Sequence, residues 1–341
     1  LAPGELRRTQ LYSGGAEAVE AAIRLAKAYT GHFEVIGFWG GFHGKTGGVL
    51  GLVGDRFKHQ HGHMAPGLYQ VPYANCYRCP FETTYPACSF LCVEFLRKTI
   101  RHNTTGSIAA ILVEPIQGTA GNVVPPAGFL KELLGVAREN GALLIADEMI
   151  TGFGRTGKLF GVEHEGIVPD ILTLGKGMGG GFPVSALIST DEIVSARPFS
   201  LPSASSSSYG GNPLAAEAAR ATLEILLEEK LVENSRDQGA WILAELQKMA
   251  ERFPFIGQVR GRGLMIGVEL VRDRKSREPL SPQASQAIFQ IALQEKILLM
   301  ITSSAIRINP ALTLSRKEAA EGVEILERIF HRVHSTGTHL L

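Results

Sequence analysis

Cysteine is scarce in this sequence and confined to one segment. The chain has four cysteines among 341 residues, and all of them fall between Cys76 and Cys92. A secreted domain held together by disulfides would distribute its cysteines over more of the chain. We therefore expect a protein of a reducing, cytoplasmic compartment.

An excess of one charge and long apolar runs are also missing. Lysine and arginine total 34 and aspartate and glutamate 33, which leaves a net charge of +1. Such a sequence lacks the basic surface that binds nucleic acid or an anionic membrane. No run reaches the ~18 apolar residues that a membrane-spanning helix needs, so we expect a soluble globular protein. The chain opens at Leu1 and not at a methionine, so this end says nothing about targeting.

What the sequence does have is an alternation of short apolar runs with longer amphipathic stretches. Strands rich in isoleucine, leucine and valine and separated by helices predict a largely parallel sheet covered on both faces. The candidate strands are 33–38, 108–113, 142–147 and 171–174, and the candidate helices are 16–30, 89–102, 128–140 and 213–229.

The length favours two domains, because single cores stop growing near ~250–300 residues. We expect a large α/β domain over residues 1–230, with a mostly parallel sheet, and a smaller α+β domain over residues 231–341. For the second domain the pattern predicts a helix continuing over 235–252, strands within 258–271, a helix near 283–295, strands at 297–301 and 305–308, and a last helix at 316–332.

Two buried strands end in residues that carry chemistry. One ends in Asp147, and the other is followed by Lys176 between two glycines. Ligands of open α/β sheets bind at the carboxyl ends of strands, so both side chains are expected at the same edge. Alone, each has an ordinary interpretation, a turn-capping aspartate and a surface lysine. Together they supply what pyridoxal phosphate requires, an amine for a Schiff base and a carboxylate that keeps the ring nitrogen protonated.

The phosphate and the flat ring of that cofactor also find candidate contacts. Residues 13–16, Ser-Gly-Gly-Ala, precede the first predicted helix, where free backbone N–H groups and the positive helix end attract an anion. Phe42 follows the strand 33–38 and could stack on the ring, although a core phenylalanine is the alternative.

Two glycine-rich motifs suggest nucleotide binding, but neither has the required context. Residues 175–180 match G-x-G-x-x-G, yet glycine and Pro183 follow in place of a helix. Residues 40–46 end like a triphosphate-binding loop, but Trp39 stands where the first glycine should be. A nicotinamide dehydrogenase or a nucleotide-binding module is therefore the weaker interpretation. An absorbance spectrum separates the two, because a bound imine is yellow.

Taken together, these motifs resemble those of the class-III, omega-type aminotransferases, which are pyridoxal enzymes of fold type I. Residues 144–181 contain the series Asp-Glu, Gly-Phe-Gly-Arg-Thr-Gly, Pro-Asp-Ile and Gly-Lys with a glycine cluster. Further matches over nearly the whole chain are Gly15-Ala16-Glu17-Ala18, Phe42-His43-Gly44, Glu114-Pro115-Ile116-Gln117-Gly118, Tyr209-Gly210-Gly211-Asn212-Pro213 and Gly261-Arg262-Gly263.

The resemblance implies that the mostly parallel sheet of the large domain is of the seven-stranded type, and it implies a cofactor site. Its residues are Gly15, Ala16, Phe42, His43, Glu114, Asp147, Met149, Lys176 and Ser208. Lys176 forms the Schiff base and carries the proton, and Asp147 pairs with the ring nitrogen. The amides of Gly15 and Ala16 bind the phosphate. One ring face lies against Phe42 and the other against Met149.

The resemblance also implies a substrate contact and an assembly. Arg307 matches the arginine that holds a substrate carboxylate as a bidentate fork. Ser208 stands where the family usually has threonine, whose hydroxyl reaches the phosphate of the partner subunit. A homodimer, possibly a dimer of dimers, with a shared active site is therefore expected.

Three departures weaken the inference of a substrate. Thr119 stands where members that accept both an omega-amine and glutamate often have a glutamate that neutralises the arginine. Ile150 stands where many members have a glutamine that contacts the phenolic oxygen of the cofactor. Members typically have a further N-terminal segment, to which nothing in residues 1–341 corresponds.

The cysteines have two interpretations. By residue type and closeness, Cys76, Cys79, Cys88 and Cys92 could form a four-thiolate zinc site, but their spacing is not a standard one. Free structural thiols are the alternative, and we expect no metal. The histidines at 59, 61 and 63 are expected in a solvated loop.

The sequence therefore predicts a transaminase that works by ping-pong chemistry. An amino acid or omega-amine would be the donor, and pyruvate or 2-oxoglutarate, held by Arg307, the acceptor. The alternative is an enzyme of the same fold with another outcome, a dialkylglycine-type decarboxylase, an amino-acid racemase or epimerase, or an aminomutase. Thr119 slightly favours that alternative.

Overall fold

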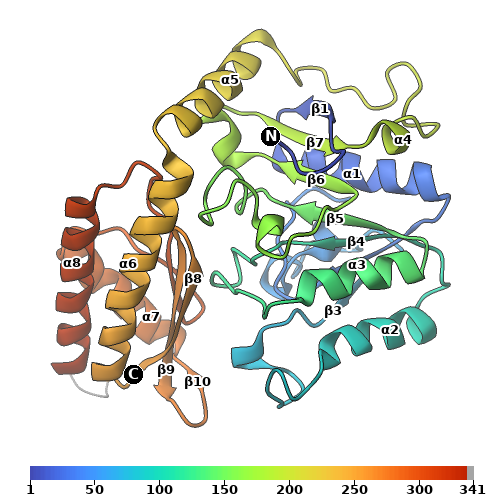
Figure 1. Ribbon diagram of the computed structural model, residues 1–341. Helices are drawn as coiled ribbons and strands as arrows, with labels where there is room; N and C mark the ends of the chain where they lie inside the picture. Colours follow the sequence, from blue (N-terminus) through green and yellow to red (C-terminus); the bar gives the residue numbers. More distant parts are fainter. Residues whose placement is uncertain (336–341) are drawn as a thin grey trace. The chain divides into compact units, whose positions relative to one another are not determined.

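The computed structural model describes residues 1–335, which form two compact units (Figure 1). The first unit contains residues 1–118, 125–153 and 159–229. The second contains the chain from residue 230 together with two short segments, 119–124 and 154–158. No helix among the described residues is long and apolar enough to cross a membrane.

The first unit is built on a seven-stranded sheet with the order β1-β7-β6-β5-β4-β2-β3. Its strands are β1 (Arg8–Tyr12), β2 (Glu34–Phe38), β3 (Leu68–Val71), β4 (Ile108–Val113), β5 (Leu143–Asp147), β6 (Ile171–Leu174) and β7 (Ser185–Ser189). Neighbouring strands from β6 to β3 are parallel, whereas β7 runs antiparallel to both β6 and β1. The mostly parallel sheet expected from the sequence is confirmed.

Helices cover both faces of this sheet. The helices that pack on its strands are α1 (Gly15–Thr30), α2 (Leu91–Asn103) and α3 (Phe129–Glu139). The unit also contains α4 (Asp191–Val194), which packs on α1, and α5 (Pro213–Glu228). One face of α1 carries small and branched apolar residues, among them Val19 and Leu25, which pack on Leu112 and Ile145 of the sheet. Burying such a side chain contributes about 1.5–3 kcal/mol. The helix ends at Gly31, whose left-handed φ of 70° lets its amide reach the Lys27 carbonyl.

The second face of the sheet is closed by aromatic packing. Phe129 at the start of α3 makes edge-to-face contacts with Phe38 of β2 and with Tyr73, at centroid distances of 5.9 and 5.1 Å. Because both faces are covered, the central strands β2, β4, β5 and β6 are buried along their whole length. This accounts for their continuous apolar runs in the sequence.

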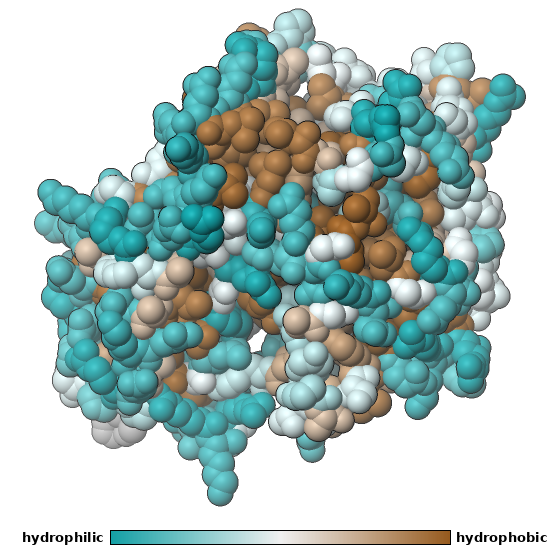
Figure 2. Space-filling model, in the orientation of Figure 1, coloured by the Kyte–Doolittle hydropathy of each residue, from teal (hydrophilic) through white to brown (hydrophobic). Residues whose placement is uncertain are grey.

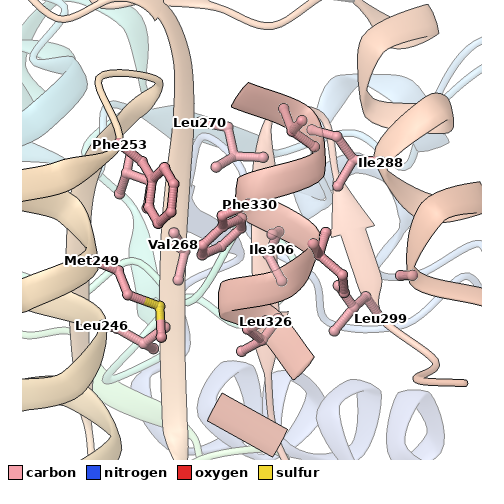
Figure 3. Close-up of a cluster of buried hydrophobic side chains, with 14 of the residues drawn as sticks. Leu246, Met249, Phe253, Val268, Leu270, Ile288, Leu299, Ile306, Leu326 and Phe330 are labelled. Atoms are coloured by element: carbon pink, nitrogen blue, oxygen red, sulfur yellow. The ribbon is translucent and has the colours of Figure 1, made fainter. Parts of the chain in front are cut away.

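The second unit is an antiparallel sheet with three helices. Its elements are α6 (Leu231–Arg252), β8 (Ile256–Arg262), β9 (Met265–Asp273), β10 (Glu278–Pro279), α7 (Pro282–Gln294), β11 (Met300–Thr302), β12 (Ala305–Ile308) and α8 (Arg316–Ser335). Figure 3 shows the core between sheet and helices, where Phe253, Leu270 and Phe330 are buried among aliphatic side chains.

A buried ion pair fastens the short segment 119–124 to this second sheet. Arg260 Nη2 donates to Glu269 Oε2 at 2.7 Å and to the Gly121 carbonyl at 2.8 Å, and Nε donates to the Asn122 carbonyl at 3.2 Å. Ser304 donates to the other carboxylate oxygen of Glu269. The segment therefore belongs to the second unit although it follows β4 in the chain.

Two boundaries differ from those expected from the sequence, those of α6 and β11, and the turn between β8 and β9 adds a third detail of this unit. The helix expected to continue past residue 229 is broken at Lys230, which has a left-handed φ of 53°. The turn between β8 and β9 lies at Gly263 and Leu264, and a side chain at Gly239 of α6 would collide with the Gly263 carbonyl. The strand expected from residue 297 begins at Met300, after a left-handed Lys296.

Candidate active site

Five of the predicted site residues come from the same edge of the first sheet. Glu114 follows β4, Asp147 ends β5, Lys176 follows β6, and Phe42 follows β2. Gly15 follows β1, which runs parallel to β6 because both are antiparallel to β7. The carboxyl ends of these strands therefore meet at one edge, where open α/β sheets bind their ligands.

Asp147 and His43 form the buried centre of this edge. His43 Nδ1 lies 2.7 Å from Asp147 Oδ2, and both side chains are almost completely buried. The other carboxylate oxygen accepts the Met149 amide at 3.1 Å. With Asp147 ionised, His43 Nδ1 is the donor, so the histidine orients the carboxylate and leaves it able to pair with a cation.

Two more carboxyl groups lie around Asp147. Glu114 accepts the amides of Phe42 at 2.9 Å and Gly118 at 3.1 Å, and burial raises its pKa above the usual value, with Asp147 adding to the rise. Glu148 is fully buried, and burial raises its pKa to about 7. A cationic ring nitrogen would offset the crowding of negative charge at this edge.

Glu148 was not among the predicted site residues. Its carboxylate accepts the amides of Gly161 and Val162, each at 2.8 Å, and the hydroxyl of Thr151. It thus holds the loop that follows β5. Its place directly after Asp147 was the available signal, but an exposed glutamate is the usual interpretation of an acidic residue after a strand.

Met149 connects the lysine turn to the start of α1. A Cβ at Gly15 would lie 3.1 Å from Met149 Sδ, and a Cβ at Gly175 would lie 2.7 Å from the same atom. Glycines at these two positions therefore let the backbone approach the thioether. The structure thus brings Met149, Gly15 and the Lys176 turn together.

Lys176 has an unusual backbone for its residue type. It has a left-handed φ of 44° and follows Gly175, and its side chain is exposed on a surface of the first unit. Non-glycine residues with positive φ are uncommon and gather at functional sites. Only a short 3-10 turn, Lys176–Gly179, follows, so the helix that a dinucleotide-binding motif needs is absent from this part of the structure.

The start of α1 is arranged as an anion site. Glu17 accepts the amides of Ser13 at 3.0 Å and Gly14 at 3.3 Å, and the Ser185 hydroxyl donates to the Gly14 carbonyl at 2.8 Å. These bonds fix the turn before the helix. The amides of Gly15 and Ala16 belong to the first turn, which has no intrahelical acceptors, so they remain available for a phosphate. Ser185, on β7, gave no signal in the sequence.

Phe42 lies at this edge as a half-buried ring. It packs edge-to-face on Phe57 at a centroid distance of 5.1 Å, and its amide is held by Glu114. An aromatic ring, a buried carboxylate, an exposed lysine and a helix start thus occur together in one unit. This set of groups fits pyridoxal phosphate.

Ser208 and Arg307 are the remaining predicted residues, one in each unit. Ser208 is exposed on a loop whose residue Ser205 accepts the Tyr12 hydroxyl at 2.9 Å. Arg307 lies on β12 of the second unit, where its Nη1 is 3.1 Å from Met300 Sδ. Gly121 packs against Gly267, the cross-strand partner of Arg307, so the segment from Thr119 crosses the face that carries this arginine.

The four cysteines are free, half-buried thiols. In residues 1–335 no group of three histidine, cysteine, aspartate or glutamate side chains is placed to hold a metal ion. The arrangement therefore gives no support to the four-thiolate zinc site considered above.

Comparisons with known proteins show the family to which the chain is similar. The family model for class-III aminotransferases matches residues 1–330. A leucine/methionine racemase of Thermococcus litoralis is 36% identical over 317 residues, which are 92% of this chain and 71% of the relative. A diaminobutyrate–2-oxoglutarate aminotransferase of Haemophilus influenzae is 34% identical, with 91% and 70% covered.

A solved structure is also similar. An amine transaminase from an uncultivated Pseudomonas species superposes with a TM-score of 0.92 at 34% identity. The match covers 96% of this chain and 78% of that one.

Proposed function

This chain belongs to the class-III aminotransferase family, whose cofactor is pyridoxal phosphate, and we propose that Lys176 and Asp147 carry its transamination. The donor would be an amino acid or omega-amine and the acceptor pyruvate or 2-oxoglutarate. The observation that carries the assignment of residues is the buried Asp147–His43 pair at the strand edge that also bears Lys176. When bound, the cofactor supplies a carbonyl for the amine and an electron-withdrawing ring.

Lys176 has two tasks in this proposal. Its Nζ would bind the cofactor covalently until a substrate amine takes its place. The released Nζ would then take the proton from the substrate carbon and deliver it to a carbon of the cofactor. Its exposed side chain on a turn with glycines on either side has the freedom that both tasks need.

Asp147 would hold a proton on the ring nitrogen. Its carboxylate is fixed by His43 Nδ1 and the Met149 amide, so little reorganisation is needed when the charge develops. Glu114 would contribute to the cofactor site by positioning Phe42, because its carboxylate accepts the Phe42 amide. Gly15 and Ala16 would hold the phosphate with their amides.

The acceptor's carboxylate is assigned to Arg307. Its guanidinium can pair with a carboxylate in a bidentate manner. Thr119, on the segment that crosses the same sheet face, offers no carboxylate there. This supports acceptors and donors that bring a carboxylate of their own to Arg307.

A homodimer in the cytoplasm completes the proposal. The first unit has large exposed apolar side chains at and near α5, with Tyr209 76%, Leu214 71% and Leu227 50% exposed. Figure 2 shows apolar side chains gathered beside α5. An obligate interface buries ~2,000 Å² or more, and Ser208 would lie in it, near the partner's phosphate. Sedimentation of the purified protein should give a dimer or a multiple of it.

Racemisation of an amino acid is the second candidate function. It is favoured by the similarity to the Thermococcus litoralis racemase and by Thr119. The two functions use the same Lys176 and Asp147 and differ in whether the proton returns to the substrate carbon on the other face.

One assay separates the two candidates. The holoenzyme is given a panel of L-amino acids and omega-amines, with and without pyruvate or 2-oxoglutarate, and the products are identified. Transamination gives a new amino acid from the acceptor and no product without it. Formation of the D-amino acid in the absence of any 2-oxo acid would assign the chain to racemisation.

A further inference from the structure

The four cysteines of the chain converge on one cavity outside the active site. Cys76, Cys79, Cys88 and Cys92 line a space of about 20 Å³ together with neighbours such as Tyr73 and Pro80. Cys76 begins a 3-10 turn, Cys88 lies in the turn before α2, and Cys92 is in the first turn of that helix. Residues up to 16 positions apart in the chain thus meet around a space about as large as one water molecule.

The thiols are close enough to influence one another. Burial raises the pKa of Cys76, and Cys88 and then Cys79 add to the rise. Burial raises the pKa of Cys92 to about 11, with smaller contributions from Cys76 and Cys88. Cys76 therefore interacts electrostatically with each of the other three thiols, and the formation of a second thiolate in the cavity is disfavoured.

Because all four thiols line the same small space, two of them can be joined by a disulfide. A metal ion could also join them, but no three such side chains in the described part of the chain are placed to hold one. Cys92 is fixed on a helix, whereas Cys76 and Cys88 both lie in turns, which adjust more easily. Reversible disulfides in a reducing compartment are usually redox-sensing.

We propose that Cys76 and Cys88 form a reversible disulfide, which makes this cavity a redox-sensitive modification site. The oxidant is a low-molecular-weight disulfide of the glutathione class. One cysteine thiolate attacks it and releases one thiolate of the oxidant, and the second cysteine then attacks the mixed disulfide and releases the other. Two protein thiols are oxidised, one oxidant disulfide is reduced to two thiols, and the two cysteine protons end on these thiols.

The site also touches the scaffold of the first unit. Tyr73, which lines the cavity, donates to the carbonyls of Glu114 and Pro115, each at 3.1 Å. Covalent closure therefore tethers the segment that leads from Tyr73 to α2. The proposal does not depend on the transamination reaction, and its test uses no activity.

The test uses the purified holoenzyme treated with glutathione disulfide. Wild type should fall from four titratable thiols to two, lose the mass of two hydrogen atoms, and recover with dithiothreitol. Peptide mapping should join the peptides that contain Cys76 and Cys88. The Cys92→Ser variant should still form this link.

The matched control is Cys76→Ser, which keeps the size of the side chain. In this variant Cys88 has lost its partner, so it should form a mixed disulfide with one glutathione and no link to another peptide of the chain. Wild type that shows only glutathione adducts, no reaction, or a disulfide between another pair of cysteines overturns the proposal, as does stoichiometric zinc in the purified protein.

Discussion

Replacing Asp147 by asparagine removes one negative charge from the centre of the site and almost nothing else. The side chain is 2% exposed and fixed by His43 and Met149, and asparagine keeps its shape. An ion pair about 4 Å apart is worth about 4 kcal/mol at the effective dielectric constant of a protein site. Since about 1.4 kcal/mol corresponds to a factor of ten in rate, we expect kcat to fall by roughly 10³.

The assay is steady-state transamination by the purified holoenzyme, with the best donor and acceptor from the panel. Asp147→Asn should still bind the cofactor at Lys176 and keep its yellow colour, because the amine is untouched. Asp147→Ala should lose at least as much rate. Asp191→Asn is the matched control, since this exposed carboxylate of α4 pairs with Arg8 on the surface and should keep full activity.

The outcome that would refute the reasoning is a turnover of Asp147→Asn within about ten-fold of wild type, because the charge and not the shape is the proposed agent. If the Asp147→Asn variant is unfolded, it shows no thermal unfolding transition, which distinguishes this case from a folded variant of low activity. In that case Asp147→Glu, which keeps the charge, is expected to regain part of the rate.

Three further predictions concern the acceptor, the buried acid and the ion pair. Arg307→Ala should raise KM for the 2-oxo acid by roughly 10–100-fold, and it should leave the half-reaction of an amine without a carboxylate unchanged. If stopped-flow spectra show equal loss of rate in both half-reactions, Arg307 has a structural role and does not bind the substrate. The folded protein holds the Glu148 proton more tightly than the unfolded chain does. The free energy of unfolding should therefore fall by about 3 kcal/mol as pH rises from about 5 to above 7. Wild type should show a lower Tm at the higher pH, and Glu148→Gln should lack this decrease. Arg260→Met should lower the free energy of unfolding in urea by about 3–5 kcal/mol, because it removes the counter-charge of the buried Glu269. Adding Glu269→Leu should recover most of this loss.

The sequence predicted those parts of the fold that depend on local periodicity. The strands that end in Asp147 and precede Lys176 are buried on both faces, so their apolar runs are continuous and their bounds nearly correct. β1 and β7 gave no comparable signal, because β1 is a half-exposed edge strand and β7 has only three apolar residues between two serines. Their antiparallel pairing places Gly15 at the site, and no local pattern contains that information.

The candidate site residues were proposed from their motifs, but their contacts could not be predicted in this way. His43 and Asp147 are 104 residues apart, and a hydrogen bond over that distance follows from the order of strands and not from spacing. The assignment of segment 119–124 to the second unit depends on the Arg260–Glu269 pair, whose partners lie on neighbouring strands. Such long-range contacts become visible only when the sheet order is known.

The central claim, that Lys176 holds the cofactor, is tested most directly by reduction with borohydride. The holoenzyme is reduced, digested and mapped by mass spectrometry. The account predicts pyridoxal phosphate fixed on the peptide that contains Lys176 and no labelling in Lys176→Ala. Label on Lys45 or Lys158 in place of Lys176 would contradict it.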